Sequence, residues 1–205
     1  LYFGLHKTAR QWVFREWAPN ATKIYLVGDF NGWKESEKYR LCPVGDSGNW
    51  ELKLPIKAMK HLDLYKMKVY WNGGCGERIP AWCQRVVQDE GTKIFSAQVW
   101  DPEKPYVFSK RTFRPHRDPL LIYECHIGMG QDAEKVGSYN EFRENVLPRV
   151  VKEGYNCLQI MALQEHPYYG SFGYHVSSFF ASSSRFGTPD ELKQLIDEAH
   201  KNGIA

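Results

Sequence analysis

The first half of the chain contains the stretch that decides its fold, Trp17–Trp33, which reads WAPNATKIYLVGDFNGW. Within it, a run of β-forming residues, Lys23–Val27, lies between two turn signals, Ala18-Pro19-Asn20 and Asn31-Gly32. Outward from this stretch, further short runs rich in β-formers occur at Trp12–Trp17, Trp50–Leu54, Tyr65–Val69 and Ile94–Trp100. Short strands at this spacing, separated by glycine and asparagine turns, predict an antiparallel β-sandwich over residues 1–105.

The segment WELKL at positions 50–54 indicates how such a strand faces the core. Successive side chains of a strand point to opposite faces of the sheet. Trp50, Leu52 and Leu54 therefore share one face, which we expect to be buried, and the charged Glu51 and Lys53 share the other.

All seven tryptophans lie in the first 100 residues, which is more large aromatic surface than the core of one sandwich requires. Glycan-binding proteins use flat aromatic rings to stack on the apolar faces of sugars. Trp33 follows the turn Asp29–Gly32, and because turns lie at the surface it is our candidate sugar-stacking residue. Packing over the edge of the sandwich is the alternative for Trp33. We expect Trp12, Trp17 and Trp50 to pack in the core or between domains.

The second half of the chain has a different hydrophobic period. Leu120–Cys125 and Cys157–Met161 are short apolar runs typical of buried parallel strands. Between them, a helix is expected to begin at the capping pair Ser138 and Glu141 and to kink at Pro148.

A second helix is predicted to start at the capping box Thr188–Glu191 and to stop at Gly203, with Ile204–Ala205 opening a third strand. The order strand, helix, strand, helix indicates βαβ units and a parallel sheet. Two strands and two helices cannot close a parallel barrel. We therefore expect residues 119–205 to be the truncated start of an α/β domain that continues beyond Ala205.

A basic segment, residues 106–118, separates the two halves and lies next to prolines at both of its ends. It has little hydrophobic periodicity, so we interpret it as a linker. Its cationic cluster is either a solvated surface, which we favour, or a clamp between two acidic faces; the cluster comprises Lys110, Arg111, Arg114 and Arg117.

Composition excludes several classes of protein. No apolar run approaches the roughly 18 residues that span a bilayer, and the first ten residues lack a signal-like hydrophobic segment. A net charge of +3 does not favour nucleic acid as a partner. Five scattered cysteines without metal-binding spacing indicate reduced thiols and no metal site, and we expect no cofactor. We expect a cytoplasmic monomer, or a plastid protein if a transit peptide precedes Leu1.

Two parts of the sequence resemble a known family. Trp17–Trp33 resembles the start of the starch- and glycogen-binding β-sandwich that precedes the barrel in branching and debranching enzymes, which implies that Trp33 contacts glucan. Ile122–Gly128 (IYECHIG), Asn145–Arg149 (NVLPR) and Tyr155–His200 are similar to the α-1,4-glucan branching enzymes of the eukaryotic-like glycogen and starch type. The resemblance implies a carbohydrate-binding module followed by the first two βα units of an incomplete (β/α)8 barrel, of the α-amylase superfamily.

The resemblance also implies an activity and a partner. Such enzymes cleave an α-1,4 bond with retention and transfer the chain to a 6-hydroxyl of an α-glucan, either glycogen or starch. Tyr174 would stack against the sugar beside the cleaved bond, and His175, which stands where relatives often carry glutamine, is the second substrate-binding candidate in this loop. The catalytic aspartates and glutamate would lie beyond Ala205, so the 205-residue chain alone is expected to be inactive.

Other interpretations of the sequence stay open. Glu124 and Glu165, on or just after adjacent strands, could form a catalytic carboxylate pair, although structural roles fit both better. The chain could also be a non-catalytic α-glucan-binding protein. A debranching hydrolase of the same superfamily is the third possibility, because it would share the sandwich.

Overall fold

The computed structural model describes residues 2–109, 112–114 and 119–205. The chain separates into two compact units, Leu1–Pro102 with Ser178–Ala181, and Glu103–Ser177 with Ser182–Ala205. Most of the predicted basic cluster, at positions 110, 111 and 117, lies outside the described residues, whereas Arg114 is described and exposed. The boundaries predicted for the sandwich, linker and α/β domain remain predictions.

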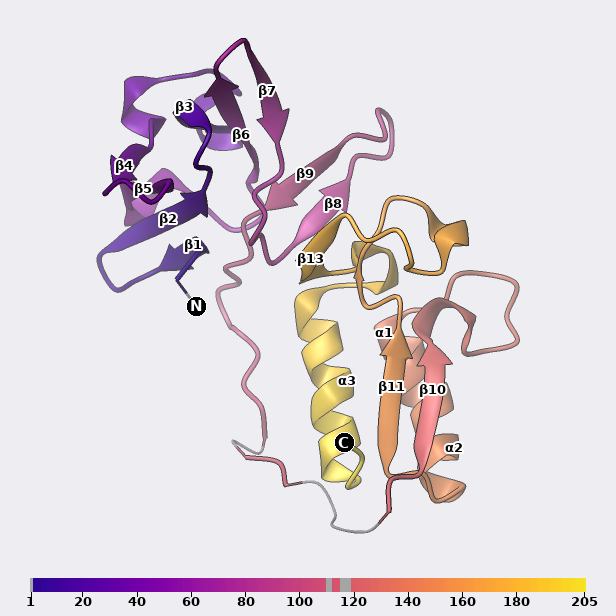
Figure 1. The fold of residues 1–205 in the computed structure, drawn as a ribbon. Helices are drawn as coiled ribbons and strands as arrows, with labels where there is room; N and C mark the ends of the chain where they lie inside the picture. The colour runs from indigo at the N-terminus through magenta and orange to yellow at the C-terminus, as the bar shows by residue number, and fades with distance from the viewer. Residues whose placement is uncertain (1, 110–111, 115–118) are drawn as a thin grey trace. The chain divides into compact units, whose positions relative to one another are not determined.

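The first unit consists of two antiparallel sheets (Figure 1). The first sheet has the order β1-β2-β5-β4 and contains β1 (Gly4–Lys7), β2 (Gln11–Trp17), β5 (Asn49–Pro55) and β4 (Cys42–Val44). The second has the order β3-β6-β9-β8, with β7 on β6, and contains β3 (Ala21–Gly28), β6 (Leu64–Trp71), β9 (Phe95–Gln98), β8 (Val86–Gln88) and β7 (Gly74–Arg78).

One hydrophobic core joins the inner faces of these two sheets. Phe14 and Leu52 enter it from the first sheet, and Leu26 and Tyr65 enter it from the second. The predicted alternation in residues 50–54 is confirmed, because Trp50, Leu52 and Leu54 are buried and the charged pair between them is not. The predicted antiparallel sandwich is therefore the architecture of the first unit.

Trp17 was expected to pack in the core or between domains, and the core alternative is wrong. Trp12 and Trp50 are buried, but the Trp17 side chain is 53% exposed. Glu16 takes the inward position at this end of β2, where its carboxylate accepts hydrogen bonds from the backbone N–H groups of Trp17 and Ala81. Since side chains alternate along a strand, Trp17 points outward.

The second unit contains a parallel pair of strands, β10 (Ile122–His126) and β11 (Cys157–Met161). Helical segments follow the strands and cover one face of the pair (Figure 1). They are α1 (Tyr139–Glu141), a π-helical stretch Phe142–Val146, α2 (Leu147–Lys152) and α3 (Pro189–Lys201). The segment between β11 and α3 contains the short strands β12 (Gln164–Glu165) and β13 (Ser178–Ser182), and Ser178–Ala181 of β13 belong to the first unit.

The predicted helix starts are confirmed. Ser138 and Thr188 are N-caps whose side chains accept a hydrogen bond from the backbone N–H three residues on, at Glu141 and Glu191. Pro148 was predicted to kink this helix, and the structure shows a change of helix type in the turns before it. Because proline lacks an N–H, the turns before it widen into the π-helical stretch, and Pro148 sits in the first turn of α2.

The end of the chain lies along β11. The N–H of Leu158 donates to the carbonyl of Ala205 at 2.8 Å, and the N–H of Ala205 donates to the carbonyl of Asn156 at 2.9 Å. These bonds continue the sheet on the side of β11 away from β10, as predicted for Ile204–Ala205, although the two residues are not assigned as a strand. The face of β10 and β11 opposite the helices is exposed at Ile122 and Gln159.

Candidate functional site

Trp33 is held at the surface of the first unit by its own turn. It follows the 3-10 turn Asp29–Asn31, is 40% exposed, and adopts a left-handed backbone with φ of 62°. Its indole Nε1 donates to Oδ1 of Asp29 at 2.9 Å, and the other oxygen of Asp29 accepts the N–H of Leu64 at 2.7 Å. One carboxylate therefore anchors the tryptophan ring to β6. The ring is fixed, yet a large part of it stays open to solvent.

Gly28 makes this turn possible. A Cβ at Gly28 would lie 2.2 Å from the carbonyl oxygen of Leu64, so only glycine allows β3 and β6 to approach here. The backbone N–H of Trp33 donates back to the carbonyl of Gly28 at 2.9 Å. The GDFNGW sequence thus encodes a rigid turn that presents one aromatic ring.

Two tyrosine–glutamate pairs hold the segment that follows Trp33. Tyr70 donates to Glu35 at 2.6 Å, and Tyr25 donates to Glu37 at 2.7 Å. The hydrogen bond to Glu35 raises the pKa of Tyr70 to about 12. Lys23 lies over the Tyr70 ring, with its Nζ 4.4 Å from the ring centroid. These contacts join the turn to the outer faces of β3 and β6.

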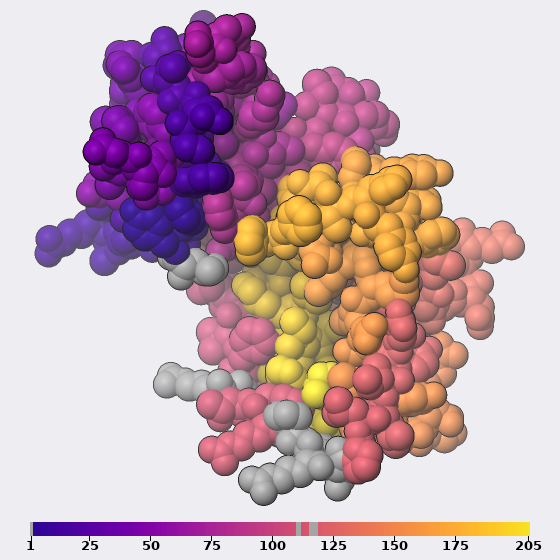
Figure 2. All heavy atoms as spheres, viewed as in Figure 1, coloured from indigo at the N-terminus to yellow at the C-terminus, as the bar shows by residue number. Residues whose placement is uncertain are grey.

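The two other predicted site residues lie in the second unit, in the long loop after β11. Tyr174 is 78% exposed and His175 is also exposed. The N–H of Tyr174 donates to the carbonyl of Ser171 at 3.0 Å, which ties it to the 3-10 turn Tyr169–Ser171. The space-filling view shows this loop, in orange, as a surface of the second unit (Figure 2). The structure places Tyr174 and His175 together, and Trp33 on the other unit.

The loop that carries Tyr174 is built from strained backbone. Ala162 and Phe172 have positive φ values of 57° and 50°, which non-glycine residues rarely adopt. Gly173 packs so closely that a Cβ there would lie 2.3 Å from the Cα of Ala162. Strain of this kind persists only where the surroundings fix it, and it concentrates at functional sites.

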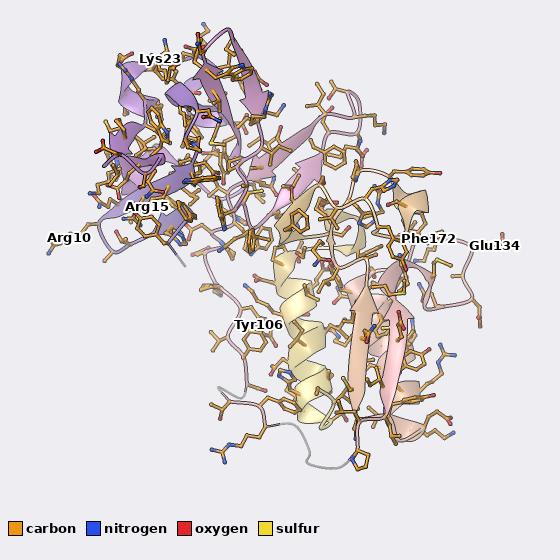
Figure 3. All side chains as sticks on the ribbon, viewed as in Figure 1. Arg10, Arg15, Lys23, Tyr106, Glu134 and Phe172 are labelled. Carbon is orange, nitrogen blue, oxygen red and sulfur yellow. The ribbon has the colours of Figure 1, made fainter. Side chains whose placement is uncertain are left out.

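Two further aromatic residues of this loop, which were not singled out from the sequence, are exposed: Tyr168 (64% exposed) and Phe172 (43% exposed). Figure 3 labels Phe172 in the loop beyond the arrowheads of β10 and β11. The density of rings in YYGSFGY, residues 168–174, was the available signal. Together with Tyr174, these side chains give the loop several rings on which a sugar could stack.

A buried histidine pair was also missed. His126, the last residue of β10, is 9% exposed, and His166 is fully buried. The His126 ring meets the rings of Tyr169, Phe172 and Phe186 edge-on at 5.5–6.1 Å between centroids. Burial, together with the nearby His166, lowers the pKa of His126, which favours the neutral form of the imidazole. Among the described residues, neither ring nitrogen of His126 has a hydrogen-bond partner.

The two candidate carboxylates have different surroundings. Glu165 is 1% exposed, and its oxygens accept the backbone N–H groups of His166 at 3.1 Å and Ser184 at 2.8 Å. Those bonds fix the loop backbone, so we assign Glu165 a structural role. Glu124 lies on the exposed face of β10.

Within the described ranges, no group of three or more histidine, cysteine, aspartate or glutamate side chains could hold a metal ion. In the same residues, no helix is both long and apolar enough to cross a bilayer.

Comparison with known proteins extends over both units. The family model for carbohydrate-binding module 48 (isoamylase N-terminal domain) matches residues 2–83. The 1,4-α-glucan-branching enzyme of Dictyostelium discoideum is 42% identical over 99% of this chain, and that of Equus caballus is 44% identical over 98%. This chain is similar in sequence to 1,4-α-glucan-branching enzymes. It spans 30% of the length of each of these two relatives.

A third branching enzyme, "1,4-alpha-glucan-branching enzyme 2-2, chloroplastic/amyloplastic" of Arabidopsis thaliana, is 45% identical over 94% of this chain and 24% of its own length. Solved structures agree in fold. The match to a putative α-amylase from Salmonella typhimurium covers 100% of this chain and 32% of the α-amylase chain, with a TM-score of 0.80 and 21% sequence identity. The match to the pullulanase of Bacillus acidopullulyticus covers 99% of this chain and 28% of the pullulanase chain, with a TM-score of 0.78 and 18% sequence identity.

Proposed function

We propose that this chain is the glucan-binding and first barrel portion of a 1,4-α-glucan-branching enzyme. The whole protein would cleave an α-1,4 bond with retention and transfer the released chain to a 6-hydroxyl, forming an α-1,6 branch in glycogen or starch. One observation carries the proposal: the identity of 42–45% to branching enzymes extends over 94–99% of the chain and so includes both units.

In this proposal residues 1–105 are the carbohydrate-binding sandwich, 106–118 a linker, and 119–205 the start of a (β/α)8 barrel. The parallel pairing of β10 with β11 and the helices on one face support a barrel start. So do the hydrogen bonds between Ala205 and β11. The uncovered face of the strands would become the inside of the barrel, where side chains of alternate strands pack in layers.

Three residues would contact the glucan. Trp33 presents a fixed and exposed ring, the geometry needed for stacking on a glucosyl unit. The family resemblance implies that Tyr174 stacks on the sugar beside the cleaved bond, and its place on a loop at the carboxyl end of β11, where barrel enzymes build their active sites, supports this role. His175, its exposed neighbour, would hydrogen-bond the same sugar.

The reaction needs two carboxyl groups about 5–5.5 Å apart for retention. Glu165 is engaged by backbone N–H groups and does not serve as either of them. As the family resemblance implies, we propose that the catalytic carboxylates lie in the part of the protein beyond Ala205. We also propose a monomer in the cytoplasm or, as the name of the Arabidopsis relative states for that protein, in a plastid.

The test compares the 205-residue chain with the natural protein that contains it, each incubated with amylose. The natural protein should lower the iodine absorbance and create α-1,6 signals in the proton NMR spectrum without a matching rise in reducing ends. The 205-residue chain should leave amylose unchanged. Linear chains released from a branched substrate would instead identify a debranching hydrolase. A natural protein that binds glycogen but changes no linkage would be a non-catalytic glucan binder.

A further inference from the structure

Trp17 and Trp33 are the two exposed tryptophans among the seven, at 53% and 40%. The family resemblance implied a role for Trp33 only. Trp17 ends β2 on the outer face of the first sheet, so its ring is available for contact.

The Trp17 ring is held in the same way as that of Trp33. Its indole Nε1 donates to the carbonyl of Ser47, in the turn between β4 and β5, at 3.0 Å. The Trp33 indole donates to Asp29 at 2.9 Å. In both cases the single polar atom of the ring is used internally and the ring orientation is fixed. A pre-ordered ring loses little conformational freedom when a ligand stacks on it.

Polar groups flank the Trp17 ring on the outer face of the same sheet. Asn49 lies directly opposite Trp17 in the β2–β5 ladder, and its amide nitrogen donates to the Ser47 hydroxyl at 2.7 Å. Two residues along, Arg15 pairs with Glu51 at 2.7 Å on the same face. A flat ring for the apolar face of a sugar, beside amide, guanidinium and carboxylate groups for its hydroxyls, is the chemistry of glycan recognition.

The two rings lie at opposite ends of β3. Trp17 comes just before the turn that leads into Ala21, and Trp33 comes just after the end of β3 at Gly28. At about 3.3 Å per residue, the strand between them is roughly 23 Å long. A single glucosyl unit cannot reach both rings, so the unit has two separate places for stacking.

We propose that Trp17 is a second α-glucan-stacking platform, which makes the sandwich bivalent toward branched polymers such as glycogen. The inference rests on the proposed glucan binding by this chain. Two weak sites on one rigid unit strengthen binding to a polymer that offers many chain ends, because the second contact forms at a high effective concentration.

Titration of the 205-residue chain with maltotetraose tests this by NMR of the indole N–H resonances, assigned with single tryptophan-to-phenylalanine variants. We expect the Trp17 and Trp33 resonances to shift, while those of the buried Trp12 and Trp50 stay in place and report an intact fold. Movement of Trp33 alone would overturn the second platform and leave the proposed function standing. If no resonance moves, the glucan-binding function fails as well.

Binding to glycogen gives a second readout. Trp17→Ala should weaken the apparent glycogen affinity of the 205-residue chain about tenfold or more, as expected when one of two linked contacts is lost. Trp17→Phe, which keeps a ring, should lose less. Ile94→Ala is the matched control, because Ile94 is also 53% exposed on the first unit, and it should bind like the unmodified chain. Equal affinity of Trp17→Ala and the unmodified chain would overturn the proposal.

Discussion

The two units differ in how the faces of their sheets are covered. In the first unit, the inner faces of two sheets bury one another, and the exposed rings of Trp17 and Trp33 sit outside that core. In the second unit, helices cover one face of β10 and β11, and the other face is exposed at Ile122, Glu124 and Gln159. The second unit also carries His126, buried without a hydrogen-bond partner among the described residues.

This difference shows what each unit requires. The first has the two-layer organisation of a self-contained domain. The parallel strands of the second are of the kind that proteins normally cover on both faces. Because all seven tryptophans belong to the first unit, their fluorescence reports on it alone, and the helical circular dichroism signal reports on the second.

The largest effect is expected from the sandwich core. Leu26→Ala removes a fully buried side chain and should lower the free energy of unfolding of the first unit by about 2–5 kcal/mol. Urea unfolding followed by tryptophan fluorescence measures it. Leu120→Ala is the matched control, because Leu120 is 58% exposed and belongs to the second unit. A fluorescence transition that moves equally in both variants would show that the two units do not unfold separately.

Trp33→Ala separates binding from stability within the first unit. By analogy with other stacked rings, it should weaken glycogen binding by roughly 1–3 kcal/mol. The fluorescence transition should change little, because Trp33 lies outside the core. Binding that stays the same while stability falls sharply would instead make Trp33 a packing residue at the sandwich edge.

A substitution at the N-cap of α3 tests the stability of the second unit. Thr188→Ala removes the N-cap of α3 and should cost about 1 kcal/mol, seen as a lower midpoint of the helical signal with no shift in tryptophan fluorescence. Thr188→Ser keeps a capping hydroxyl and should behave like the unmodified chain. A Thr188→Ala chain that shifts the fluorescence transition instead would contradict the separation of the two units.

The smallest effect concerns pH. Asp197 on α3 accepts hydrogen bonds from the Tyr106 hydroxyl at 2.7 Å and from Ser109, and Tyr106 lies beside α3 in Figure 3. The bond from Tyr106 is the main reason that the pKa of Asp197 falls from 3.8 to about 2. Because the folded pKa is depressed, the stabilisation is complete above pH 4 and is lost as the pH falls toward 2.

The melting temperature of the second unit should therefore fall as the pH is lowered from 4 to 2. Tyr106→Phe should reduce that dependence, because the phenylalanine leaves Asp197 with a more ordinary pKa. An identical pH profile in Tyr106→Phe and the unmodified chain would show that the hydrogen bond does not set the pKa of Asp197.

Local patterns predicted much of this fold because the interactions involved are local. The alternation of apolar and charged residues at positions 50–54 predicted the buried face of β5, and the capping pairs that begin at Ser138 and Thr188 predicted two helix starts. Cys157–Met161 was predicted with the bounds that the structure shows. In each case neighbours within four residues determine the outcome.

Long-range contacts explain what the sequence did not predict. Trp17 points outward because its neighbour Glu16 takes the inward position. There the Glu16 carboxylate accepts a hydrogen bond from the N–H of Ala81, 65 residues away in the sequence. The His126 cluster depends on rings brought from residues 169–186. In the site, Trp33 was found from its position after a surface turn and Tyr174 through resemblance, while the Asp29 carboxylate that anchors Trp33 emerges only from three-dimensional packing.

The central claim, that this chain binds α-glucans through its first unit, is tested most directly by equilibrium binding of the 205-residue chain to glycogen. The account predicts saturable binding that added maltotetraose weakens and that cellotetraose, with β-1,4 linkages, leaves unchanged. Combined Trp17→Ala and Trp33→Ala substitutions should reduce it to background. A chain that stays unbound at all glycogen concentrations, or a double variant that binds as well as the unmodified chain, would contradict it.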